Sequence, residues 1–247
     1  MQTNFLSCVE SRIYDRGQIY ARFHLGTFFR GQALTIANAL RRTLLAELPG
    51  IVITSVEIQG INHEFAILPG IQESVLDILL NLKQLVFTTS LRNFHFLEEE
   101  HFLDSVFLKI HGPAQVTATD LKLPSHLTCV NPSSHIATLS PSGELAISFQ
   151  LKLVNSKDLS IKKENQVEDK LNKGKIFCLD TVPTSVRKVN YSLYDLDSKK
   201  GSEYISLEIW TDGSIHPIQA LNFALKKLTK LFFDFTEVSQ NLSIESK

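Results

Sequence analysis

The chain has 247 residues, which is long enough for one large domain or two modest ones with a buried core. Hydrophobic residues make up 43% and charged residues 21%, as is typical of globular proteins, and no apolar run approaches the roughly 18 residues of a membrane span. The formal net charge of −1 argues against a free-standing DNA-binding domain, which usually carries a basic excess.

The first third of the chain switches twice between a strand pattern and a helix pattern. Ile19, Ala21, Phe23 and Leu25 alternate with polar residues, which predicts a half-buried strand. Apolar residues then recur every three or four positions up to a Pro-Gly pair that ends a helix. The predicted elements are a strand over 18–25, a helix over 32–48, a strand over 51–59 and a helix over 71–85.

The middle of the chain is predicted to be rich in strands separated by Gly-Pro, Asn-Pro and Pro-Ser-Gly turns. Alternating apolar residues predict strands over 105–111 and 145–153, and the polar run 155–175 is interpreted as a solvated loop. Alternation returns on both sides of a polar turn at 195–201. The pattern there predicts an antiparallel hairpin with strands around Tyr191 and Leu207.

A final helix is predicted to begin at Pro217, because proline is favoured at the first helical position. Its apolar residues form a seam at spacings of three and four, consisting of Ile218, Leu221, Leu225, Leu228, Phe232 and Phe235. Phe223, Ala224 and Leu231 give the helix a second apolar flank. The seam fits either a partner helix or complete burial within one chain.

The sequence shows no catalytic machinery of a known kind. It contains no phosphate-binding loop, nucleophile elbow or acidic motif that would hold two Mg²⁺ ions. The run from His95 to His101 has the wrong spacing for a zinc helix, and Cys8, Cys129 and Cys178 are far apart without a C-x-x-C pair. We therefore predict no catalytic residue, no metal and no cofactor in this chain.

Several motifs together resemble one protein family. The segment RGQALTIANALRRTLLAELPG begins at Arg30, and VEIQGINHEF and GIQESVLDILLNLK follow it. Later segments are GPAQVTATD, VRKVNYSLYD and TDGSIHPIQAL. These motifs, in this order, resemble the amino-terminal region of α subunits from bacterial and plastid DNA-directed RNA polymerases.

The resemblance implies an α+β fold with two domains. A discontinuous dimerisation domain would comprise residues 1–48 and 181–237, and an inserted, mostly β domain would comprise residues 49–180 and contact the large subunits. Residues 238–247 would form a tail. The family's carboxy-terminal DNA-binding domain is expected to be absent, because the chain stops soon after the final helix.

The resemblance also implies the assembly residues. Contacts to the β and β′ subunits are expected at Arg41, Arg42, Leu45 and Lys83. The homodimer interface is expected at Ile36, Leu40, Leu225, Leu228, Phe232 and Phe235. Taken without the resemblance, an arginine such as Arg42 on a helix face is more often simply solvated.

The resemblance further implies a scaffold within a larger enzyme. The expected partners are a second copy of the chain, the β and β′ subunits (with β″ in a plastid) and a sigma factor, and DNA would be met only through the complex. Mg²⁺ would belong to the catalytic subunits, and no membrane is involved. The missing domain and the divergent middle favour the plastid stroma, and a bacterial cytoplasm is the alternative.

Overall fold

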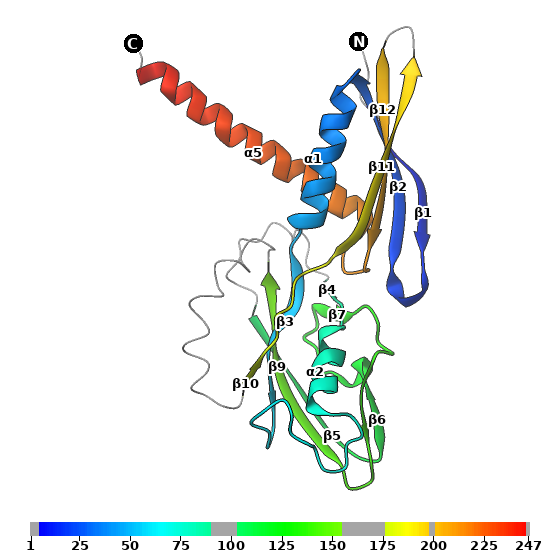
Figure 1. Cartoon of the computed structure of the whole chain (residues 1–247), viewed down its shortest axis with the longest axis vertical. Coiled ribbons are helices and arrows are strands. Elements are labelled where there is room, and N and C mark those ends of the chain that lie inside the picture. The colour runs from blue at the N-terminus through cyan, green and yellow to red at the C-terminus, as the bar shows by residue number, and fades with distance from the viewer. Residues whose placement is uncertain (1–4, 90–102, 155–175, 198–200, 246–247) are drawn as a thin grey trace. The chain divides into compact units, whose positions relative to one another are not determined.

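The computed structural model describes residues 5–89, 103–154, 176–197 and 201–245. The chain forms two compact units (Figure 1). Unit 1 combines residues 1–48 with residues 184–247, and unit 2 is residues 49–183. The sequence prediction placed the same first boundary and a second one after residue 180. The polar run 155–175 and the segment from His95 to His101 lie outside the described residues.

Unit 1 is built on a four-stranded antiparallel sheet in the order β1-β2-β12-β11. Its strands are β1 (Phe5–Ile13), β2 (Ile19–Phe29), β11 (Val186–Asp197) and β12 (Ser202–Thr211), and a short 3₁₀ turn (Asp15–Gly17) joins the first two. The helices are α1 (Gln32–Ala46) and α5 (Pro217–Glu245), which pack against each other and against this sheet. The central pair joins β2 to β12, strands that are about 180 residues apart in the sequence.

The core of unit 1 follows from the alternation of its strands. Ala21 and Phe23 of β2, with Leu207 and Ile209 of β12, are completely buried on the face that meets the helices. Ala37 of α1 is also completely buried in this core. The burial of these apolar surfaces supplies the main driving force for folding of the unit.

Unit 2 contains a second four-stranded antiparallel sheet in the order β10-β3-β9-β5. These strands are β3 (Gly50–Ile58), β5 (Leu103–His111), β9 (Glu144–Val154) and β10 (Ile176–Cys178). Two further antiparallel pairs are β4 (Phe87–Thr89) with β7 (Leu127–Cys129) and β6 (Ala114–Thr117) with β8 (His135–Leu139). A short 3₁₀ turn (Ala118–Asp120) follows β6.

The helix of unit 2, α2 (Val75–Lys83), has clear start and stop signals. Ser74 and Asp77 form a reciprocal capping box that satisfies two backbone N–H groups at the start of the helix. Lys83 lies in the last turn, where the helix dipole stabilises a positive charge. The apolar stripe of α2 is buried along its whole length, at Val75, Ile78, Leu79 and Leu82.

The α+β class predicted from the sequence is confirmed. The predicted elements over 18–25, 32–48, 51–59, 105–111 and 145–153 are present as β2, α1, β3, β5 and β9, and the predicted hairpin is β11 with β12. The helix predicted over 71–85 is shorter, because α2 begins at Val75 and ends at Lys83. Strands β1, β4, β6, β7, β8 and β10 were not predicted. Helix α5 continues to Glu245, through most of the residues 238–247 that were predicted as a tail. A helix of 29 residues spans about 44 Å at 1.5 Å per residue.

Candidate functional site

The apolar stripe of α5 passes from a buried to an exposed environment. Ala220, Leu221 and Ala224 are completely buried in the core of unit 1, and Leu228 is half-buried. Leu231 and Phe235 stand seven residues after Ala224 and Leu228, so they lie on the same helix face. They are nevertheless 49% and 68% exposed. The stripe therefore runs past the end of the core that covers its first half.

Two further apolar residues lie on this part of α5. Phe232, at the edge of the stripe, is 65% exposed, and Phe233, on the opposite side of the helix, is 59% exposed. On the stripe side, Leu231, Phe232 and Phe235 form an exposed apolar patch of the kind that marks a protein interface, and Phe233 lies outside this patch. Of the predicted dimer residues, Phe232 and Phe235 are thus available to a partner.

The other predicted dimer residues are more enclosed. Ile36, Leu225 and Leu228 are half-buried and pack against the core of unit 1. Leu40 is completely buried in that core. We therefore correct the assignment of Leu40. It points from α1 into its own unit and has no surface to offer a second chain, because helix periodicity places it on the same face as Ala37 and Leu44.

Polar contacts hold α1 in place on unit 1. Lys227 of α5 pairs with Glu47 just after α1 at 3.7 Å, and its ammonium lies 5.6 Å from the ring centroid of Phe223. The hydroxyl of Tyr191 on β11 donates a 2.7 Å hydrogen bond to Asn38 Oδ1. Both contacts position α1 between α5 and β11, so the outward face of the helix is oriented by its own unit.

That outward face carries the predicted large-subunit contacts of α1. Arg41, Arg42 and Leu45 are all exposed, and Leu45 is 43% exposed. They fall within one helical turn on the side opposite the buried residues. Among the described residues, neither arginine forms an ion pair or hydrogen bond, so both guanidinium groups can reach carboxylates or carbonyls of another chain.

Lys83, the remaining predicted contact, lies in unit 2. It is exposed at the end of α2, together with Leu76 and Leu80, which are 41% and 48% exposed. Lys83 therefore belongs to a different unit from Arg41, Arg42 and Leu45.

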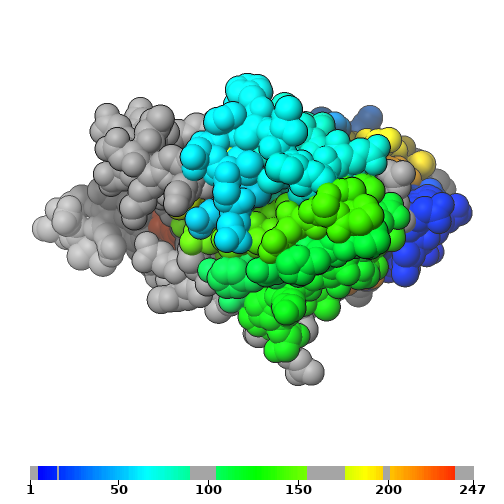
Figure 2. All heavy atoms as spheres, turned by 90° about the horizontal axis from the view of Figure 1, so that it is seen from below, coloured from blue at the N-terminus to red at the C-terminus, as the bar shows by residue number. Residues whose placement is uncertain are grey.

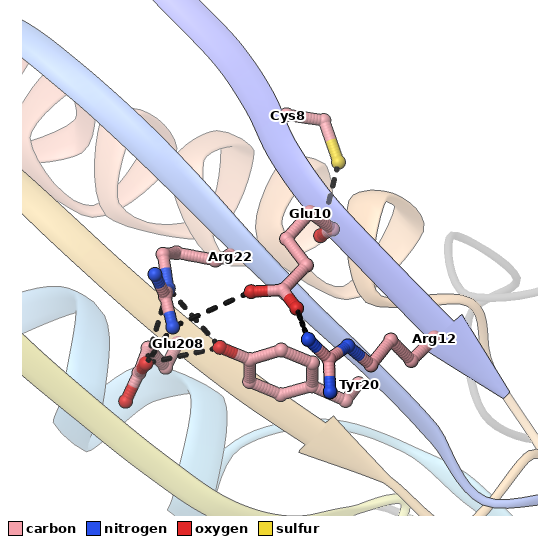
Figure 3. A network of polar contacts seen from close by, with 6 residues as sticks. All are labelled: Cys8, Glu10, Arg12, Tyr20, Arg22 and Glu208. Carbon is pink, nitrogen blue, oxygen red and sulfur yellow. Dashed lines mark hydrogen bonds and ion pairs between the residues drawn. The ribbon is translucent and has the colours of Figure 1, made fainter. Parts of the chain in front are cut away.

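The sheet face of unit 1 that lies away from the helices carries a network of charged residues (Figure 3). Arg22 Nε donates to the Tyr20 hydroxyl at 3.1 Å and to Glu208 Oε1 at 3.2 Å, and the Tyr20 hydroxyl also donates to Glu208 at 2.9 Å. Glu10 bridges Arg12 and Arg22. Burial raises the pKa of Tyr20, so its hydroxyl stays protonated. These contacts tie β1, β2 and β12 together and suit cross-strand stabilisation.

A buried carboxylate stands at the turn before α5. Asp212 is 6% exposed and accepts hydrogen bonds from the Ser214 backbone N–H at 2.9 Å and the Ser214 hydroxyl at 2.5 Å. Burial raises the pKa of Asp212, and the hydrogen bonds from Ser214 and the charge of Arg187 partly oppose this effect. The carboxylate closes the turn that starts α5, which is a structural role.

The described part of the chain contains no cluster of three or more His, Cys, Asp or Glu side chains that could hold a metal ion. Among the same residues, no helix is long and apolar enough to span a membrane. What the described surfaces offer is contact area, namely the exposed apolar part of α5 and the arginine-bearing face of α1.

Comparisons with known proteins agree with this description. Residues 56–182 match the family described as the RNA polymerase Rpb3/RpoA insert domain. The chain is 45% identical to the DNA-directed RNA polymerase subunit alpha of Chlorella vulgaris, with 96% of each chain covered. It is 37% identical to that subunit of Cyanidium caldarium and 38% identical to that of Thermosynechococcus vestitus, covering 96% of this chain and 74% and 73% of those proteins. The chain belongs to the family of DNA-directed RNA polymerase α subunits.

Proposed function

We propose that the chain forms a homodimer through α5 and serves as the platform on which the large polymerase subunits assemble. The observation that carries the proposal is the α5 stripe, whose second half is exposed although its first half is buried. A second copy offers the same stripe, so a two-fold pair of chains can cover both exposed halves at once. Family membership supports an assembly role, because polymerase subunits work within a complex.

The large subunits are proposed to bind at two places on the chain. Arg41, Arg42 and Leu45 form a face on which cations are flanked by apolar surface, and arginine is enriched among residues that dominate interface energetics. Lys83 is proposed as a contact of unit 2. The proposed partners are β and β′, with β″ in a plastid enzyme, and a sigma factor in the holoenzyme.

In this proposal the chain supplies structure and the other subunits supply chemistry. RNA synthesis from ribonucleoside triphosphates, with its Mg²⁺ ions, would take place on the large subunits, and DNA would be bound through the complex. The relatives come from algae and cyanobacteria, and the 45% identity to the Chlorella subunit supports a place in the plastid stroma.

Dimerisation is tested by placing two charges on the exposed half of the stripe. Phe232→Asp with Phe235→Asp should leave the chain folded, because both side chains are already more than half exposed in one chain. At a dimer interface the same change would bury two unpaired carboxylates at a cost of several kcal/mol each. Sedimentation should then show a monomer, and circular dichroism should show an unchanged fold.

The matched control places two charges on the other side of the same helix segment. Thr229→Asp with Phe233→Asp alters exposed residues away from the stripe and should leave the dimer intact. A folded dimer of the Phe232→Asp, Phe235→Asp variant would refute the placement of the interface on the stripe.

A further inference from the structure

The outward face of α1 carries an asparagine between its two arginines. Asn38, Arg41 and Arg42 are all exposed. At about 3.6 residues per turn, Asn38 lies about 40° around the helix from Arg42 and about 60° in the other direction from Arg41. The three side chains therefore share one surface within a single turn, which we call the donor face of α1.

The side chain of Asn38 is bonded to a different element of unit 1. Asparagine is a poor residue for the middle of a helix, because its side chain competes with the backbone for hydrogen bonds. Here the hydroxyl of Tyr191 on β11 donates to Asn38 Oδ1 at 2.7 Å, across 153 positions of sequence. The bond thus joins the two chain segments, one before and one after unit 2, that make up unit 1.

Tyr191 is itself held in place by the core of unit 1. Its side chain is half-buried and packs against that core. On the sheet, Tyr191 pairs with Leu207 of β12, which is completely buried. Because the ring is fixed by packing, the hydroxyl reaches Asn38 from one defined direction. A side chain fixed in this way can orient a neighbouring group that meets a partner.

The bond from Tyr191 decides which end of the Asn38 amide is offered to a partner. An amide has an oxygen that accepts and a nitrogen, Nδ2, with two N–H donors. Tyr191 occupies Oδ1, and among the described residues nothing accepts a hydrogen bond from Nδ2. Arginine likewise has N–H donors and no acceptor. With Asn38 oriented by Tyr191, the donor face therefore presents N–H groups from three side chains.

Charge indicates what such a face binds. Helix α1 contains two arginines and no acidic residue. Helix α2 differs, since it exposes Asp77 as well as Lys83; it belongs to unit 2, whose cyan and green residues face the reader in Figure 2. Nucleic-acid affinity depends on the number of phosphates neutralised, and two cations neutralise few. Carboxylate or carbonyl oxygens on a protein surface fit the donor face better.

We propose that Tyr191 is a positioning residue for assembly, which fixes the Asn38 amide so that Nδ2 donates, beside Arg41 and Arg42, to carbonyl or carboxylate oxygens of the β subunit. This inference rests on the proposed assembly role, and it adds one contact residue and the residue that orients it. The donor face is complete only when β11 is packed beside α1. The sequence pattern predicts that Tyr191 faces the core, but it does not show that the hydroxyl reaches α1.

The first test removes each partner of the bond in the full-length chain. Tyr191→Phe keeps the ring and should weaken capture of the purified β subunit by about three- to tenfold, the range for one hydrogen bond. Asn38→Ala removes the donor itself and should weaken capture by about tenfold or more. The matched control is Tyr194→Phe on the same strand, which is 49% exposed, stacks on Tyr204 and should change capture by less than about twofold. Sedimentation should show a dimer for every variant.

A double-mutant cycle tests whether Tyr191 acts through Asn38. In the Asn38→Ala background, Tyr191→Phe should cause no further loss of capture, because the amide that it orients is gone. If Tyr191 acted only on the stability of the fold, Tyr191→Phe would cause the same fold-loss in both backgrounds. Capture is measured well below the unfolding temperature of every variant.

A second substitution separates donation by Asn38 from simple fastening of α1. Asn38→Asp keeps an oxygen that can accept from Tyr191 but has no N–H donor, and it should weaken capture at least as much as Asn38→Ala. The control for the added charge is Thr35→Asp, which lies exposed one turn earlier on α1 and should weaken capture less. Capture by Asn38→Asp at the wild-type level would overturn the donor role.

Each remaining result decides a different claim. A wild-type chain that captures no β subunit would refute the proposed assembly role itself. If Arg42→Ala weakens capture and Asn38→Ala does not, only the Asn38 contact is refuted. Loss of the dimer in Asn38→Ala would assign the donor face to a second copy of the chain and overturn the proposal. If Tyr191→Phe fails to fold, the variants of the exposed Asn38 decide.

Discussion

Units 1 and 2 each pack helix stripes against antiparallel strands, but they complete their cores differently. The stripe of α2 is buried over its full length within unit 2. The stripe of α5 is buried only as far as Ala224, is half-buried at Leu228, and is exposed from Leu231 to Phe235. The same 3.6-residue period thus supports a closed core in one unit and an open surface in the other. Periodicity indicates which face of a helix is apolar, and the extent of the fold decides whether a single chain can bury that whole face.

The largest effect is expected in the closed core of unit 2. Leu82→Ala removes a completely buried side chain from α2 and should lower the free energy of unfolding by about 3 kcal/mol, through lost burial and the cavity left behind. Leu80→Ala, on the half-exposed side of the same helix, should change it by less than about 0.5 kcal/mol. Urea unfolding measures both. Equal effects would show that α2 is not packed as described.

The next effect concerns the surface of α1 that the core leaves free. Arg42→Ala should leave folding and dimerisation intact and weaken capture of the β subunit by about 2 kcal/mol, the usual loss at an anchoring interface arginine. Binding is measured with immobilised full-length chain. Arg12→Ala, on an exposed residue of β1, is the control and should leave capture unchanged. If the Arg42→Ala variant captures the β subunit as well as wild type does, Arg42 is a solvated surface residue and does not contact β.

The two units should differ in how their free energy of unfolding depends on protein concentration. If unit 1 completes its core by pairing, each tenfold dilution should lower its free energy of unfolding by about 1.4 kcal/mol per mole of dimer, whereas unit 2 should be insensitive to dilution. The chain has a single tryptophan, Trp210 on β12, so its fluorescence reports on unit 1. The unfolding midpoint reported by Trp210 is compared at protein concentrations of about 1 and about 100 micromolar. An unchanged midpoint would contradict pairing of two chains through the exposed half of the α5 stripe.

The smallest effect is a difference in pH dependence between the half-buried carboxylate of Glu73, which accepts hydrogen bonds from Thr138, and the buried carboxylate of Asp212. The pKa of Glu73 in unit 2 is lowered, so its contribution to stability is present above the unfolded pKa and is lost as the pH falls through the folded pKa. The pKa of Asp212 in unit 1 is raised on folding. The folded state must therefore ionise a buried carboxyl group as the pH rises above the unfolded pKa of about 4, and this lowers its stability.

Two isosteric variants test the signs. Between pH 7 and pH 3, wild type should lose stability relative to Glu73→Gln, by no more than the roughly 1.5–3 kcal/mol of a hydrogen bond to a charged group. Relative to Asp212→Asn, wild type should instead gain stability as the pH falls over the same range. The free energy of unfolding is measured in urea at each pH. A pH dependence of the same sign for both carboxylates would show that hydrogen bonds do not dominate at Glu73 or that burial does not dominate at Asp212.

Local pattern was sufficient to predict much of the secondary structure. Alternation at Ile19 to Leu25 and at Leu145 to Leu153 predicted β2 and β9, and the period of three to four predicted α1, α2 and the start of α5. These signals are strong because each element buries one face. Its apolar residues therefore recur at the period of the backbone, every second residue in a strand and every three or four residues in a helix. The motif order was also sufficient to identify the family.

Only the tertiary structure decided which apolar residues are covered. Leu40 and Phe235 both belong to regular helical stripes, yet Leu40 is completely buried and Phe235 is 68% exposed. Likewise Phe65 and Ile67 lie between β3 and α2, in a segment without a regular apolar period, and they are 77% and 86% exposed. A side chain's burial depends on what the rest of the fold places beside it, and strand partners such as β2 and β12 are brought together across most of the chain.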